Sequence, residues 1–205
     1  MAGRRHSASR HARDAESDPS RDLGPPADPE AVGRKILLDR LTDQPRSRAE
    51  LAAFLTRRRV PDDVAQQLLD RFEHVGLIDD EQFARMWVES RQRSRGLAGR
   101  AIAVELRRKG VEDDVVRDAV EAIEPEDEED AARTLVRKKL RSLTRVADEQ
   151  TKVRRLVGML GRKGYGPGLA YRVVREELAL SAEIDDGLPD GDALAFDAEI
   201  NADSE

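Results

Sequence analysis

One six-residue pattern occurs three times in the chain, as LTRRRV at residues 55–60, LRRKGV at 106–111 and LGRKGY at 160–165. Each copy begins with leucine, contains basic residues and closes with a residue that can be buried. Further apolar positions match downstream of every copy. Since the copies are 51 and 54 residues apart, each repeat has room for three helices. The sequence therefore predicts three tandem three-helix repeats.

Helical periodicity supports this fold class. Between residues 31 and 180 the apolar residues recur at helical spacing, and no convincing alternating strand pattern occurs. Ser47–Arg48–Ala49–Glu50 has the form of a capping box, in which the serine caps the helix and the glutamate reaches back. A three-helix unit cannot bury all of its apolar surface alone, so we expect stacked neighbours to form one continuous core. The predicted fold is all-α.

Glycines mark the expected helix ends. Gly76, Gly110 and Gly164 stand where a helix would close in a left-handed turn. Arg59 occupies the position in the first copy that Gly110 and Gly164 occupy in the others. A left-handed conformation costs a residue with a side chain about 1 kcal/mol. We therefore expect the first turn to differ in shape from the other two.

The domain organisation follows from composition. The first thirty residues are polar and rich in proline, and the last twenty-five combine acids with glycine and proline, so both read as disordered. The predicted divisions are a disordered leader at 1–30, helical repeats at 31–76, 77–125 and 126–180, and an acidic disordered tail at 181–205.

The net charge of −6 is unevenly distributed along the chain. Residues 1–30 carry −1, residues 31–180 carry +4 and residues 181–205 carry −9. Residues 131–175 hold thirteen basic residues and two acids, a local excess of +11. A polyanion is therefore a reasonable partner for the last repeat. We expect the acidic tail either to fold back and compete for these bases or to serve only solubility.

Several protein classes are excluded by residue usage. The chain has no cysteine, which excludes disulfides and thiolate metal sites and is compatible with a reducing cytoplasm. His6, His11 and His74 have neither metal-ligand nor catalytic-triad spacing. No secretory signal begins the chain, and no apolar run approaches the roughly 18 residues of a membrane span. We predict a cytoplasmic protein with no catalytic residue, metal or cofactor.

Basic residues form the candidate binding set. Some of them end helices, where the helix dipole alone accounts for a cation. Others line helix faces, and Arg133, Arg137 and Arg141 would share one face by i, i+4 spacing, which opposes an isolated helix and favours an anionic partner. The candidates are Arg91, Arg93, Arg95, Arg100, Arg108, Lys109, Arg133, Arg137, Lys138, Lys139, Arg141, Lys152, Arg154, Arg155, Arg162 and Lys163.

Two blocks of sequence resemble the RecX family. They are Gly76–Leu77–Ile78–Asp79–Asp80–Glu81–Gln82–Phe83–Ala84 and Glu105–Leu106–Arg107–Arg108–Lys109–Gly110–Val111, in the family's order and spacing. The resemblance implies an elongated array of three three-helix repeats. It also implies a monomeric regulator that binds the RecA filament, near or on single- or double-stranded DNA. Such a regulator restrains strand exchange, ATP hydrolysis and coprotease function in DNA repair, recombination and the SOS response.

Two other functions are compatible with helical repeats. Three-helix units can resemble the helix-turn-helix modules of a transcription regulator. The expected third helices begin with Asp62–Asp63 and with Glu112–Asp113–Asp114, however, and these acids would repel DNA. A helical scaffold with only protein partners is the other alternative, which the sequence does not separate from a filament regulator.

Overall fold

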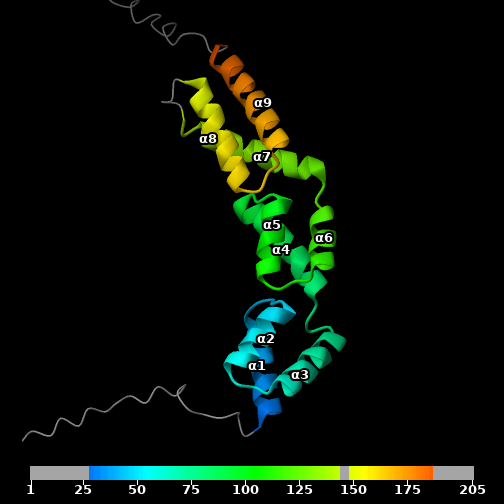
Figure 1. Cartoon of the computed structure of the whole chain (residues 1–205). Helices are drawn as coiled ribbons and strands as arrows, with labels where there is room; N and C mark the ends of the chain where they lie inside the picture. The colour runs from blue at the N-terminus through cyan, green and yellow to red at the C-terminus, as the bar shows by residue number, and fades with distance from the viewer. Residues whose placement is uncertain (1–27, 144–147, 187–205) are drawn as a thin grey trace, which may run out of the picture.

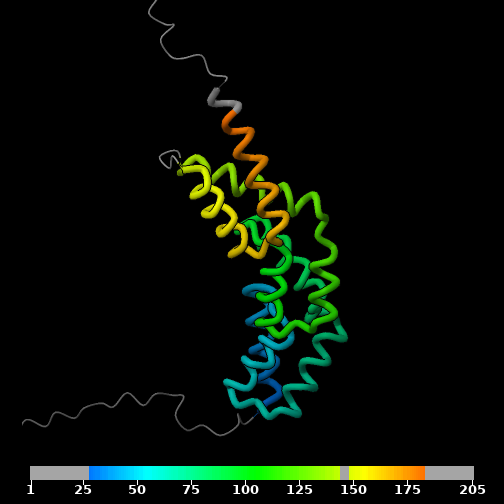
Figure 2. The backbone as a smooth tube through the Cα atoms, turned by 45° about the horizontal axis from the view of Figure 1, so that its top comes forward, coloured from blue at the N-terminus to red at the C-terminus, as the bar shows by residue number. Residues whose placement is uncertain are grey.

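The computed structural model describes residues 28–143 and 148–186, which form nine helices and no strand (Figure 1). Three consecutive helices make each unit. The helices are α1 (Pro29–Asp43), α2 (Arg48–Arg57), α3 (Asp62–His74), α4 (Asp80–Arg95), α5 (Gly99–Arg108), α6 (Asp113–Glu121), α7 (Pro125–Leu140), α8 (Glu149–Arg162) and α9 (Pro167–Asp186). The units follow one another along an elongated molecule (Figures 1 and 2), so the predicted all-α tandem array is confirmed.

Side-chain caps fix where several helices begin. The predicted capping box is present, since the Glu50 N–H donates to Ser47 Oγ and the Ser47 N–H donates to the Glu50 carboxylate. Asp79 accepts from the Gln82 N–H at 2.7 Å and starts α4. Asp148 does the same for α8 by accepting from the Thr151 N–H at 2.8 Å. Each cap satisfies a backbone donor that has no partner inside its helix.

Each unit has a hydrophobic core of its own. The first core is built around Leu37, Leu55 and Leu68, which are at most 1% exposed. Separate clusters lie around Ile102 in the second unit and Leu160 in the third. The expected continuous core is therefore wrong, because helices of 9–20 residues pack three at a time and already enclose their leucines.

Two loop residues connect neighbouring units. Ile78, between α3 and α4, is 2% exposed and packs in the first core. Ala98, between α4 and α5, is 1% exposed and packs in the third core. The chain thus anchors each junction by burying one apolar loop residue in the core of a unit.

Left-handed turns end the second helix of every unit. Gly110 and Gly164 have φ of 76° and 94°, and Arg59 has φ of 56°. The hydrogen bonding is also shared: the Val60, Val111 and Tyr165 N–H groups each donate to the leucine carbonyl five residues earlier. The expected difference in shape at Arg59 is therefore wrong, since the repeat imposes the same turn on an arginine.

At both junctions between units, a residue that begins one helix donates a hydrogen bond to the carbonyl of a lysine that ends another. At the first, Ser47 Oγ donates to the Lys109 carbonyl at 2.6 Å, and at the second the Ala98 N–H donates to the Lys163 carbonyl at 3.0 Å. Both lysines follow the last residue of a second helix, α5 or α8. The end of α5 therefore lies against the start of α2, and the end of α8 lies against the start of α5, which repeats one packing arrangement along the array.

The helical region is longer at both ends than predicted. Helix α1 begins at Pro29, because Asp28 caps it and proline suits a first turn. Helix α9 continues to Asp186, six residues into the segment predicted as a disordered tail. That boundary is therefore corrected, and the rest of the leader and tail lies outside the described residues. No helix in the described part of the chain has the length and apolar character needed to cross a membrane.

Candidate nucleic-acid interface

Repeat-equivalent arginines lie exposed at the ends of the second helices. They are Arg57 on α2, Arg108 on α5 and Arg162 on α8. None of the three forms an ion pair with any residue in the described ranges. The Arg57 guanidinium lies over the Phe54 ring at 5.0 Å, a contact that leaves its charge uncompensated. The repeat therefore places similar free cations at successive positions along the molecule.

An open groove separates the second unit from the third. Its volume is about 570 Å³. Arg100, Arg108 and Arg162 line it together with an apolar surface. That surface is formed by Leu97, Ala101, Val104 and Tyr165. Three arginines that form no ion pair within the described ranges thus converge on one groove, which Glu105 also lines.

A second groove, about 300 Å³ in volume, lies between the first and second units. Phe54, Arg57 and Arg108 line it, with Lys109 and Glu50. Arg108 therefore lines both grooves and connects them. We call Arg57, Arg100, Arg108 and Arg162 the arginine face.

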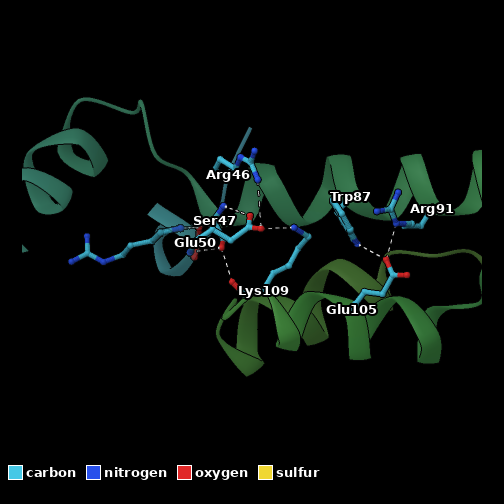
Figure 3. A network of polar contacts seen from close by, with 9 residues as sticks. Arg46, Ser47, Glu50, Trp87, Arg91, Glu105 and Lys109 are labelled. Atoms are coloured by element: carbon cyan, nitrogen blue, oxygen red, sulfur yellow. Dashed lines mark hydrogen bonds and ion pairs between the residues drawn. The ribbon is translucent and has the colours of Figure 1, made fainter. Parts of the chain in front are cut away.

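Lys109, a predicted binding residue, instead holds the first junction together (Figure 3). Its Nζ donates to Glu50 Oε1 at 2.7 Å and lies 4.2 Å from the centre of the Trp87 ring. Its side chain is only 20% exposed. An ammonium that is paired with a carboxylate and covered by an aromatic ring is not available to a phosphate.

Arg91 and its neighbours are also satisfied within the molecule. Arg91 Nε and Trp87 Nε1 both donate to Glu105 Oε2, at 2.7 and 3.0 Å (Figure 3). Arg95 lies 3.7 Å from the other Glu105 oxygen. Lys163 Nζ donates to the Arg95 carbonyl at the junction between the second and third units. Of the predicted binding residues, Arg91 and Lys163 therefore make contacts within the fold, as Lys109 does, whereas Arg95 is 60% exposed and stays a candidate for binding.

Two arginines of the predicted helix face on α7 contact acids of α9. Arg137 donates to both oxygens of Glu177, at 2.7 and 2.8 Å, and this hydrogen bonding raises the pKa of its guanidinium. Arg133 pairs with Glu129 and Glu176, and these hydrogen bonds raise its pKa as well. Acidic partners inside the protein therefore neutralise two of the three cations in the predicted like-charge stack, and Arg141 is the third.

The remaining predicted cations keep their charge uncompensated by any ion pair within the described ranges. Lys152 is half-buried and the others are exposed. They are Arg93, Arg100, Arg108, Lys138, Lys139, Arg141, Lys152, Arg154, Arg155 and Arg162. The apolar floor of the larger groove carried no sequence signal, since Leu97 and Val104 resemble ordinary core residues. Arg57 did carry one, because it stands at the repeat position of Arg108 and Arg162.

Comparison with known proteins identifies the family. Residues 79–120 match the second three-helix domain of RecX and residues 126–174 match the third. The regulatory protein RecX of Thermobifida fusca is 50% identical over 175 residues, which cover 85% of this chain and 94% of that protein. The chain belongs to the RecX family.

Other RecX proteins agree with this assignment. The regulatory protein RecX of Streptomyces coelicolor is 50% identical over 166 residues, covering 81% of this chain and 88% of that protein. A crystal structure of RecX from Lactobacillus salivarius has a TM-score of 0.69 at 21% identity, and covers 75% of this chain and 99% of that one. The Thermobifida and Streptomyces proteins are named regulators, and neither matching domain description names an enzyme.

Proposed function

We propose that this RecX-family chain binds the RecA filament on DNA and inhibits its strand exchange, ATP hydrolysis and coprotease activity, without catalysis of its own. The observation that supports the proposal is the arginine face, where repeat-equivalent arginines line two grooves between units. Arginine binds phosphate through a planar fork of donors. A row of such forks along an elongated molecule suits a partner that is itself extended and anionic, whether its DNA is single- or double-stranded.

The proposed complex contains protein as well as DNA. The groove between the second and third units combines Arg108 and Arg162 with apolar groups such as Val104, which is 45% exposed. A phosphate chain uses the arginines, and a protein side chain uses the apolar floor. One monomer acting in the cytoplasm is the simplest form of this proposal.

The test is removal of two arginines from the larger groove. The Arg108→Ala, Arg162→Ala variant should inhibit RecA-catalysed ATP hydrolysis and strand exchange less strongly than the unsubstituted chain. The salt dependence of filament binding should also flatten, by about 0.7–0.9 in log–log slope for each phosphate that the variant no longer neutralises. The matched control removes two paired cations, Arg85 and Arg117, which contact Glu81 and Asp114.

Two outcomes would argue against the proposal or change it. Equal inhibition by the double variant and its control would contradict a role for the arginine face. Weaker inhibition at an unchanged salt slope would contradict phosphate contacts at these arginines, because each lost phosphate contact lowers the slope, and would favour a helical scaffold without DNA contacts.

A further inference from the structure

An apolar groove lies between α8 and α9, away from the junctions between units. Its volume is about 510 Å³. Val153 and Val157 of α8 and Tyr171 of α9 supply its apolar surface, and Gly158 leaves room beside them. Tyr171 is 55% exposed, although it lies on a helix whose other large apolar residues mostly enter the core. The third unit therefore leaves an aromatic side chain uncovered beside two valines.

Cations border this groove. Arg154 lines it without an ion pair in the described part of the chain, and Arg175 lines it 3.6 Å from Glu149. Two arginines against one glutamate leave the groove with a positive rim around an apolar floor. A complementary ligand would combine an apolar side chain with flanking carboxylates.

The chain itself contains such a sequence after α9. Residues 187–205 read GLPDGDALAFDAEINADSE and contain six acids and no base. Phe196 lies among them, with Asp192 before it and Asp197 after it. Of the four phenylalanines in the chain it is the one that follows the helical units.

We propose that residues 187–205 dock on this groove, with Phe196 against Tyr171 and the flanking carboxylates at Arg154 and Arg175. The geometry allows it. Along α9, the fifteen residues from Tyr171 to Asp186 span about 22 Å. The ten residues from Asp186 to Phe196 extend to at most about 36 Å, so the chain can turn back and return Phe196 to the groove.

Docking of a segment of the same chain competes well against a ligand from solution. The short connection gives the acidic segment a high effective concentration at the groove. Since the pairing is partly between exposed charges, salt weakens it. Docking covers Arg154 and thereby withdraws one cation of the third unit from any other anion. It needs no partner molecule and does not depend on the proposed filament binding.

A spin label gives a direct test, because the chain contains no cysteine. Ala198→Cys in the full chain provides one attachment site for a nitroxide, two residues from Phe196. We expect the nitroxide to broaden the amide NMR signals of Val153, Val157 and Tyr171 at low salt, and less so at high salt. No broadening at these residues would overturn the proposal.

Matched variants separate docking from random collisions of an acidic segment with a basic surface. Phe196→Ala and Tyr171→Ala should each abolish the broadening, whereas Leu180→Ala, an exposed apolar residue on the same helix, should not. Arg154→Glu should weaken it more than Arg155→Glu, because Arg155 does not line the groove. If Leu180→Ala reduces the broadening as much as Tyr171→Ala, and Arg155→Glu as much as Arg154→Glu, the contact is nonspecific and the proposal is wrong.

Discussion

Gly110 lies so close to Ala49 that a Cβ atom added to the glycine would be 2.4 Å from the alanine Cβ. The next junction repeats this relationship, since a Cβ on Gly164 would be 2.7 Å from the Cβ of Ala101. Both glycines also need a positive φ. The pattern that repeats in the sequence is thus where one unit docks on another, and glycine meets both requirements at once.

Gly110→Ala should therefore destabilise the protein more than Gly76→Ala. Both substitutions place a side chain at a positive φ, which costs about 1 kcal/mol, but a Cβ on Gly76 would meet nothing within 4 Å. The clash with Ala49 should add about 1–3 kcal/mol, since the packed backbone has little room to move. Urea unfolding, monitored by circular dichroism, measures the free energy of unfolding of both variants. Equal losses of this free energy in the two variants would show that the junction accommodates the added methyl group without a free-energy cost.

Arg137→Ala should cost stability although the arginine is 58% exposed. Its removal leaves the Glu177 carboxylate, 4% exposed, without its two-point partner, and a buried acceptor that loses its donor costs about 1–3 kcal/mol. Lys138→Ala removes an adjacent exposed cation and should change the free energy of unfolding by no more than about 0.5 kcal/mol. Thermal unfolding of both variants checks this difference. A charge-reversal study of filament binding should therefore avoid Arg137.

The fold could be predicted because its signals are local. Leucine spacing, the Ser47 capping box and Gly110 each act within a few residues, and all three lie where expected. Separate cores could not be predicted, because helix periodicity shows that a face is apolar but not which helix covers it. The extension of α9 to Asp186 could not be predicted from the acidic composition after residue 180. Acidic side chains favour solvent, but they do not prevent the backbone from continuing a helix.

The binding residues could be predicted only in part. Sequence shows charge, but it does not show which acid lies opposite. Glu177 is forty residues from Arg137, and Glu50 is fifty-nine residues from Lys109, so both pairs arise only on folding. Arg108 and Arg162 are exposed and form no ion pair within the described ranges, although the residues that follow them pack at the junctions. Exposed cations and paired cations have the same sequence signature.

Tyr165 should make stability fall at high pH. It is 3% exposed, and burial raises its pKa from 10.0 to about 12. The unfolded chain loses this proton near pH 10 while the folded chain retains it, so the contribution is complete below pH 10 and is lost as pH rises towards 12. Two pKa units correspond to about 2–3 kcal/mol. The decline should be shallower in Tyr165→Phe than in Tyr171→Phe, measured by urea unfolding at each pH. Equal declines in the free energy of unfolding of the two variants would show that groups other than Tyr165 cause the loss of stability at high pH.

Ser47→Ala should uncouple the first unit from the second. Ser47 is completely buried, caps α2 and also donates to the Lys109 carbonyl across the junction. Trp87 is the sole tryptophan and packs against the second core, so its fluorescence follows that unit, whereas circular dichroism follows all three. Because units with separate cores are coupled only through their junctions, the dichroism of Ser47→Ala should begin to fall at lower urea than the fluorescence changes. Asp79→Ala removes a cap of similar value, about 1 kcal/mol, without a bond across the junction. In Asp79→Ala, dichroism and fluorescence should change at the same urea concentration. If the two transitions also coincide in Ser47→Ala, the Ser47 hydrogen bond does not couple the units.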